Sequence, residues 1–178
     1  EGKKIIIRCD LNVPIENGVI TDDTRIIASL RTIKYALRFN TKIILLSHLG
    51  KIKTEDDKKK NSLYPVAERL REYLNTEVLF SPDTCSDRLT DMVNNMKEKS
   101  VLLIENTRFE DVPDKRESEC NDDLAKYWAS LGDIFINDAY GTCHRNHTSI
   151  TGIPKYLPSG VGFLVEKELQ KIDSVLDA

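Results

Sequence analysis

Short runs of apolar residues alternate along the chain with longer stretches in which apolar residues recur every three or four positions. The short runs are rich in branched residues and contain few polar ones, a pattern typical of strands buried on both faces of a parallel sheet. We predict five such strands, at Lys4–Cys9, Lys42–Leu46, Glu77–Phe80, Val101–Ile104 and Ile134–Ile136.

The longer stretches predict helices between these strands. The first helix follows Thr21–Thr24, a segment in which any residue could act as the cap, and its apolar face carries Ile26, Ile27, Leu30, Ile33 and Leu37. Further helices are expected at Leu63–Leu74, Ser86–Met96, Asp122–Leu131 and Phe163–Leu176. Pro65 suits the first turn of the second helix, and Gly132 closes the fourth. The last helix carries an apolar stripe that we expect to be partly exposed, formed by Val165, Leu169, Ile172 and Leu176.

Strands that alternate with helices through short links predict an α/β fold. The expected architecture is a single domain with a doubly wound parallel sheet, a Rossmann-like three-layer sandwich with right-handed crossovers. Two segments lack a clear period. Lys51–Lys60 mixes both charge signs and is interpreted as a solvated loop, and Gly160–Gly162 as a turn into the last helix.

Composition narrows the class of protein. The 178 residues carry 26 Lys and Arg against 29 Asp and Glu, a net charge of -3, which argues against a general nucleic-acid binder. The apolar runs are too short to cross a bilayer, and no secretory segment is evident. Cysteines at positions 9, 85, 120 and 143 form no CxxC pair, so we predict reduced thiols and a cytoplasmic location. A strand so close to residue 1 leads us to expect a piece of a longer chain.

Ligands of open α/β sheets bind beyond the carboxyl ends of the strands, so residues that directly follow each strand are the candidates for a site. Arg25 opens the first helix at this same edge. The loops after the first, second, fourth and fifth strands contribute Asp10 and Asn12; Ser47, His48, Gly50 and Lys51; Glu105, Asn106 and Arg108; and Asn137, Asp138, Gly141, His144, Arg145 and His147. The loop after the third strand offers no cation.

These loops bring several cations to one edge of an acidic protein. Guanidinium groups hold the oxygens of phosphate or carboxylate two at a time, so the pattern predicts a site for a small, highly charged anion. The alternative is that each arginine pairs with a neighbouring Asp or Glu on the surface. The cations concerned are Arg25, His48, Lys51, Arg108 and Arg145.

Other chemistry is less well supported. No GxxxxGKS or GxxxxGKT motif is present, so no phosphate-binding loop of the Walker type is expected. His144 and His147 with Asp138 have a spacing that a metal could use, but no fourth ligand lies nearby and no metal site is predicted. Asp10 and Asp138 could act in acid–base chemistry, although hydrogen-bonding roles in loops are favoured.

Five separated motifs together resemble a known family. RCDLNVP (Arg8–Pro14), TDDTRI (Thr21–Ile26), SHLGK (Ser47–Lys51), ENTRF (Glu105–Phe109) and NDAYGTCHRNHTS (Asn137–Ser149) are similar, in order and spacing, to the N-terminal domain of phosphoglycerate kinase. GVGFLVEKEL (Gly160–Leu169) resembles the start of that family's interdomain helix. The resemblance implies an N-terminal phosphoglycerate-binding domain over residues 1–162, the start of the interdomain helix over 163–178, and a C-terminal nucleotide domain absent from this sequence.

The resemblance also implies an activity, transfer of a phosphoryl group between 1,3-bisphosphoglycerate and ADP, and the roles of individual residues. Arg25 would be the catalytic arginine, and Mg-ATP or Mg-ADP would bind the absent C-terminal domain, with no cofactor or metal in this chain. The fragment alone would be inactive. The implied contacts to 3-phosphoglycerate or 1,3-bisphosphoglycerate come from Asp10, Leu11, Asn12, Arg25, His48, Leu49, Gly50, Lys51, Arg108 and Arg145.

One motif departs from the family pattern. Arginine and proline commonly follow SHLG in that family, whereas Lys51 and Ile52 stand here. Lysine keeps the charge but lacks the planar fork that binds two oxygens. Two other functions remain open: a stand-alone domain that binds phosphorylated metabolites without catalysis, and a different small α/β phosphotransferase with its nucleotide site on this chain. Neither nucleic acid nor membrane is an expected partner.

Overall fold

The computed structural model describes residues 1–176 and contains a six-stranded sheet in which every pairing is parallel. The strand order is β5-β6-β4-β1-β7-β8. The bounds are β1 Lys4–Arg8, β4 Lys42–Leu46, β5 Val78–Ser81, β6 Val101–Ile104, β7 Ile134–Asn137 and β8 Ser159–Val161. The four inner strands are therefore the four whose following loops contain the predicted site residues.

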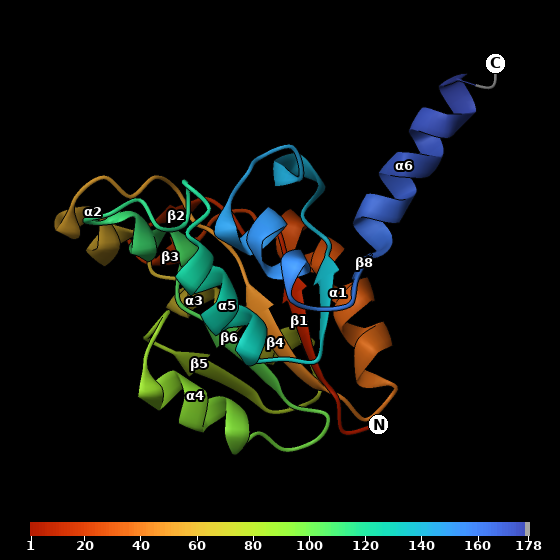
Figure 1. Cartoon of the computed structure of the whole chain (residues 1–178), viewed down its shortest axis with the longest axis horizontal. Coiled ribbons are helices and arrows are strands. Elements are labelled where there is room, and N and C mark those ends of the chain that lie inside the picture. The colour runs from red at the N-terminus through yellow and green to blue at the C-terminus, as the bar shows by residue number, and fades with distance from the viewer. Residues whose placement is uncertain (177–178) are drawn as a thin grey trace.

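Helices cover both faces of this sheet (Figure 1). The longer ones are α1 Thr24–Leu37, α3 Tyr64–Tyr73, α4 Asp87–Asn94, α5 Asp122–Ser130 and α6 Phe163–Leu176. Short turns of 3-10 helix occur at Thr107–Asp111, Tyr140–Thr142 and Ile153–Lys155, and a π-helical turn lies at Thr148–Gly152. The predicted three-layer α/β fold is confirmed.

The core divides into two clusters because successive strand residues point to opposite faces. Ile7 and Ile43 pack with apolar residues of α1 and α3 on one face. Ile6 and Ile44 pack with α4 and α5 on the other, around the fully buried Trp128. The two clusters pack against opposite faces of the inner strands, so the strand ends that carry the site loops stand on a packed core.

The charged segment after β4 is not the loop that the sequence pattern predicted. Glu55–Lys60 forms helix α2, with Thr54 as its N-cap. The Asp57 N–H donates to Thr54 Oγ1 (3.3 Å), and the Thr54 N–H donates to the Asp57 carboxylate (3.0 Å), a reciprocal capping box. No residue of α2 is buried, so the segment is solvated as expected, but its own caps make it helical.

The turn predicted at Gly160–Gly162 is also wrong in its first part. Ser159–Val161 forms the edge strand β8, with Gly160 opposite Ile136 of β7. A short antiparallel hairpin, β2 Ile15–Glu16 and β3 Val19–Ile20, was likewise not predicted. Neither element has an apolar run of strand length.

Helix α6 projects away from the body of the molecule (Figure 1). Val165 at its base is buried, whereas Leu169 and Ile172 are each almost half exposed and Leu176 is mostly exposed. The apolar stripe is therefore partly exposed, as expected. None of the helices within residues 1–176 is long and apolar enough to cross a membrane, and all four cysteines are free.

Candidate anion-binding site

The loop after β1 is tied to the loop after β4 by backbone-to-side-chain hydrogen bonds. The Leu11 N–H donates to Ser47 Oγ and the Gly50 N–H donates to Asn12 Oδ1, both at 2.9 Å. The Asn12 N–H donates in turn to Asp10 Oδ1 at 3.2 Å. Leu11 is fully buried, while Asp10 and Asn12 are half-buried at the edge. The two polar side chains are therefore held in place before any ligand arrives.

Gly50 permits the tight turn that follows His48. Its φ is +60°, in the left-handed region, and a Cβ atom there would lie 2.3 Å from Asn61 Oδ1. Only glycine adopts this conformation without strain, and only glycine leaves room for the amide. The Gly50 carbonyl accepts a hydrogen bond from Arg108 Nη1 at 2.8 Å. The turn thereby orients an arginine from the neighbouring loop.

A buried asparagine joins the loop after β6 to this turn. Asn106 Oδ1 accepts from the Leu49 N–H (3.1 Å), and Asn106 Nδ2 donates to the carbonyls of Leu49 (2.7 Å) and Asn61 (2.9 Å). The preceding Glu105 accepts from the Leu63 N–H at 2.7 Å, and burial raises the pKa of its carboxyl. The Leu49 side chain packs in the apolar core, so it is the backbone of this residue that joins the two loops.

Arg25 lies at the mouth of α1 and faces the loop after β1. Its Nη1 donates to the Asn12 carbonyl at 2.7 Å and lies 3.5 Å from Asp10 Oδ1. The Arg25 side chain is 53% exposed, so most of its donors remain available. Asp23 pairs with Arg69 at 2.6 Å instead of with Arg25. The arginine thus faces the sheet edge, and its ion-pair contact is with Asp10 and not with Asp23.

Arg8 is a member of the cluster that the sequence analysis did not single out. It is the last residue of β1 and is fully buried, with Nε donating to Ser149 Oγ at 2.9 Å and Nη1 donating to the Cys9 carbonyl. Its Nη2 lies 2.9 Å from His48 Nδ1. Burial lowers the pKa of this guanidinium. An arginine that ends an otherwise apolar buried strand was the available signal, because such a charge needs specific partners.

The Arg8 contact decides the protonation state of His48. A guanidinium can only donate, so His48 Nδ1 must accept and the ring proton resides on Nε2. Burial, followed by repulsion from Arg8 and Arg108, lowers the pKa of His48 to about 2. His48 is therefore neutral at pH 7, and it acts as a hydrogen-bond donor without adding a charge to the edge.

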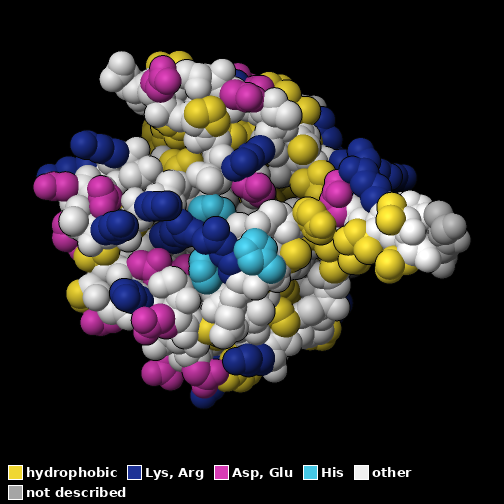
Figure 2. All heavy atoms as spheres, turned by 90° about the horizontal axis from the view of Figure 1, so that it is seen from above, with side chains coloured by type: hydrophobic (Ala, Val, Ile, Leu, Met, Phe, Trp, Pro, Cys, Tyr) yellow, Lys and Arg dark blue, Asp and Glu magenta, His cyan; other side chains and the backbone are white. Residues whose placement is uncertain are grey.

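Lys and Arg side chains gather around histidines on one face of the molecule (Figure 2), and Arg108 and Arg145 repel each other electrostatically. Burial and then repulsion from Arg145 lower the pKa of Arg108, and burial is likewise the main cause of a lowered pKa at His147. Arg145 is exposed, and its side chain makes no hydrogen bond or ion pair with residues 1–176. The alternative in which each arginine pairs with its own surface carboxylate does not describe Arg8, Arg108 or Arg145.

Lys51 stands apart from this cluster. Its side chain is exposed and has no hydrogen bond or ion pair within the described part of the chain. His144 is also exposed, and no bond to residues 1–176 fixes its ring. The structure therefore brings Asp10, Asn12, Arg25, His48 and Arg108 into one bonded network, to which Arg145 is linked by charge alone.

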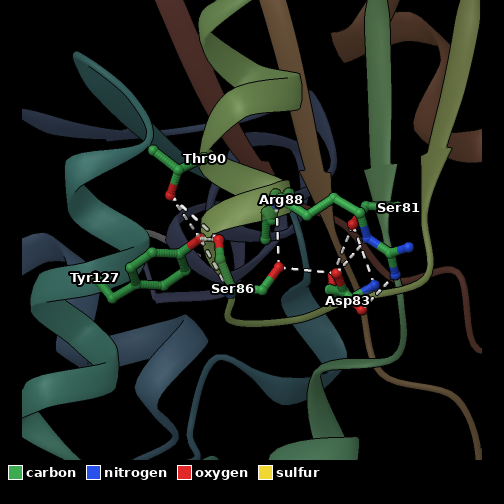
Figure 3. Close-up of polar contacts among 7 residues, drawn as sticks. Ser81, Asp83, Ser86, Arg88, Thr90 and Tyr127 are labelled. Atoms are coloured by element: carbon green, nitrogen blue, oxygen red, sulfur yellow. Dashed lines mark hydrogen bonds and ion pairs between the residues drawn. The ribbon is translucent and has the colours of Figure 1, made fainter.

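The loop after β5 uses its polar groups internally (Figure 3). Asp83 accepts from Arg88 Nε (2.7 Å) and Nη2 (2.8 Å) and from Ser86 Oγ (2.8 Å). Tyr127 of α5 donates to the Ser86 carbonyl at 2.8 Å. Because the single cation here is bound by its own carboxylate, this loop adds nothing to the anion site.

Asp138 serves the start of α6 rather than acid–base chemistry. It is fully buried, and its Oδ1 accepts from the Leu164 N–H at 2.9 Å. Burial raises the pKa of this carboxyl. Within residues 1–176 no group of three or more His, Cys, Asp or Glu side chains is arranged to hold a metal.

Fold and site together define a class. This is a parallel α/β domain whose inner strands end in loops with several cations that lack carboxylate partners, an arrangement that suits phosphate or carboxylate oxygens.

Comparison with known proteins identifies the family. The family model described as "Phosphoglycerate kinase" matches residues 1–178. Over 99% of its length the chain is 54% identical to a phosphoglycerate kinase of Listeria innocua and 52% identical to one of Fusobacterium nucleatum. It covers 45% of each of those relatives.

Solved structures agree. Phosphoglycerate kinase from Coxiella burnetii superposes with a TM-score of 0.80 at 36% identity, over 95% of this chain and 41% of that one. The enzyme from Pyrococcus horikoshii gives 0.80 at 31% identity, over 95% and 42%. The chain belongs to the phosphoglycerate kinase family and spans less than half the length of these relatives.

Proposed function

We propose that this chain is the acceptor-substrate half of a phosphoglycerate kinase, which transfers a phosphoryl group between 1,3-bisphosphoglycerate and ADP. The observation that carries the proposal is the set of preoriented cations at the carboxyl edge of the inner strands. Family membership supports the reaction. Residues 1–162 would form the phosphoglycerate-binding domain and residues 163–178 the start of the interdomain helix.

The substrate would be 3-phosphoglycerate or 1,3-bisphosphoglycerate, bound through its phosphate and carboxylate groups. Arg108 and Arg145 would neutralise charge already present in the bound ground state, while His48 would donate through Nε2–H. Asp10 and Asn12 would orient the ligand, with Leu11, Leu49 and Gly50 contributing backbone. Lys51 would add charge at the rim in place of an arginine. Such a site acts chiefly by positioning and by charge neutralisation.

Arg25 would be the catalytic residue. It is mostly exposed and keeps free donors, so it can meet charge on the phosphoryl group as that group transfers. An interaction made chiefly in the transition state raises kcat with little effect on ground-state binding. Mg-ATP or Mg-ADP would bind the part of the enzyme outside residues 1–178. We therefore expect no kinase turnover from this chain alone, and we place the enzyme in the cytoplasm.

An NMR titration of this chain with 3-phosphoglycerate tests the site. Signals of Arg25, His48, Arg108 and Arg145 should move together, and the apparent Kd should rise with salt because screening weakens charge pairing. Glycerol at equal concentration is the uncharged control and should shift none of them. Shifts confined to residues 51–60 would reject the site. Turnover by the purified chain would overturn the division of labour between the two halves.

A further inference from the structure

A buried carboxylate lies against the cationic cluster and has no role in the mechanism described above. Glu117 belongs to the segment between the 3-10 turn at Thr107–Asp111 and α5, and its side chain is fully buried. The Thr148 N–H donates to the Glu117 carbonyl at 2.9 Å, which fixes its backbone beside the loop that carries Arg145. The fold itself therefore holds the Glu117 side chain in its buried position.

Only half of the Glu117 carboxylate is satisfied by hydrogen bonds. Its Oε1 accepts from the Ser149 N–H at 2.8 Å, whereas Oε2 has no hydrogen-bond partner within residues 1–176. A buried, partly satisfied carboxylate is costly unless nearby charge compensates it. Compensation comes from Arg8 and Arg108, on which the Glu117 charge acts and whose side chains form no ion pair within residues 1–176.

The same residue is linked to the site through bonds. Ser149, whose N–H is held by Glu117, accepts the hydrogen bond from Arg8 Nε, and Arg8 in turn contacts His48 Nδ1. A chain of hydrogen bonds thus runs from the buried carboxylate to the sheet edge. Glu117 is fully buried, so it can act on a ligand at the edge only through its charge and through this chain of bonds.

This arrangement gives Glu117 opposite effects in two states of the site. With no anion present, its negative charge reduces the repulsion among the arginines. With an anion bound, Glu117 repels that anion and competes with it for the same positive charge. Because Glu117 and Arg8 are buried, water and salt screen their interactions less than at the surface.

We propose that Glu117 is a resident counter-charge that weakens the binding of phosphorylated ligands to the arginine cluster and so promotes their release. The inference rests on the proposed function, because it concerns the affinity of that same site. It differs from a structural role in a testable way, since removing a structural support weakens binding while removing a competing charge strengthens it.

Glu117→Gln keeps the size of the side chain and an oxygen for the Ser149 N–H while removing the charge. We expect the Kd for 3-phosphoglycerate, measured by isothermal titration calorimetry, to fall at least about tenfold, equivalent to about 1.4 kcal/mol. Inorganic phosphate should gain less, because it carries less charge. Without ligand the variant should melt earlier than the wild type, and added phosphate should restore more of its stability.

Two matched variants separate charge from packing. Glu117→Asp keeps the charge but shortens the reach to Ser149, and its Kd should stay near the wild-type value. Glu110→Gln removes a largely buried carboxylate that pairs with Arg116 at 2.7 Å, so the Kd should change less than about twofold, the scatter of near-neutral contacts. A folded Glu117→Gln protein that binds 3-phosphoglycerate equally or more weakly would overturn the proposal.

A measurement on the wild type covers the case in which Glu117→Gln does not fold. If the carboxylate and the ligand oppose each other, linkage requires that ligand binding also disfavour the charged carboxylate. At neutral pH, saturating 3-phosphoglycerate should therefore move the carboxyl ¹³C signal of Glu117, because the anion acts on the same cations, and should move the Glu110 signal much less. No shift in a saturated complex refutes the counter-charge role alone, whereas no binding of 3-phosphoglycerate by the wild type refutes the proposed function.

Discussion

Gly162→Ala would test how the start of α6 is fixed to the body of the domain. A Cβ atom at Gly162 would lie 2.2 Å from Asp138 Oδ1 and 2.8 Å from Asp138 Cβ. Asp138 is fully buried, and the same Oδ1 accepts the Leu164 N–H that opens α6. The new methyl group therefore collides with the side chain that caps the helix, and neither the strand end nor the helix start can move aside alone.

The size of the effect follows from two terms. Overpacking of a tightly packed site costs about 1–3 kcal/mol, and loss of the hydrogen bond to the Leu164 N–H adds about 1 kcal/mol. The free energy of unfolding should therefore fall by about 2–4 kcal/mol. For a domain of this size that corresponds to a decrease in Tm of roughly 5–15 °C.

Gly160→Ala is the matched control, two residues earlier in β8. A Cβ atom there would lie 3.5 Å from Ile136 Cδ1, an ordinary contact. We expect a change within about 0.5 kcal/mol, as for most surface substitutions. Thermal unfolding of both variants, followed by circular dichroism at pH 7, gives the comparison. Equal melting temperatures for Gly162→Ala and Gly160→Ala would refute the steric argument.

Five further outcomes are expected. Arg145→Ala should weaken 3-phosphoglycerate binding by about 1.5–3 kcal/mol with little change in Tm, since this exposed side chain has no partner among residues 1–176. Arg108→Ala should weaken binding similarly and also destabilise the fold by about 1 kcal/mol, because a backbone carbonyl loses its donor; equal Tm values for the two variants in a thermal melt would contradict this. In an enzyme extended to the length of its relatives, Arg25→Ala should lower kcat on the order of 10³-fold with a modest change in ligand Kd, and a normal kcat would remove its catalytic assignment. As pH falls from 6.5 toward 2, His48 takes up a proton in the unfolded state but not in the folded state, so the free energy of unfolding should decline. Urea titrations should show a smaller decline in His48→Gln, and the same dependence of unfolding free energy on pH in both proteins would contradict the lowered pKa of His48. Backbone amides of α6 beyond Val165 should exchange hydrogen faster than those of β1 and β4, because the outer turns expose their apolar side chains, and equal protection in a proven monomer would argue against this.

Much of the candidate site could be predicted from the sequence because its residues directly follow strands that short stretches of sequence reveal. Apolar runs and helical periods locate the elements, and the carboxyl ends of parallel strands share one edge, so Asp10, His48, Arg108 and Arg145 had to approach one another. The signal for helix α2 is also local, since Thr54 and Asp57 form a capping box within four residues. The mixed charges of Lys51–Lys60 suggest a loop, but the capping box stabilises a helix there even though none of its residues is buried.

What only the tertiary structure decided is pairing between distant residues. Strand β8 forms because Ser159–Val161 pairs with the open edge of β7. Its three residues are exposed and form no apolar run, so the sequence pattern does not predict a strand there. Arg8 reaches Ser149 across 141 positions, and Glu117 reaches the same residue across 32. The sequence by itself determined at which edge of the sheet the charged side chains would gather, because the residue types and the order of strands and helices can both be obtained from it directly. The fold decided which charges are buried and what each one contacts, because burial and hydrogen-bond geometry exist only once the chain has packed.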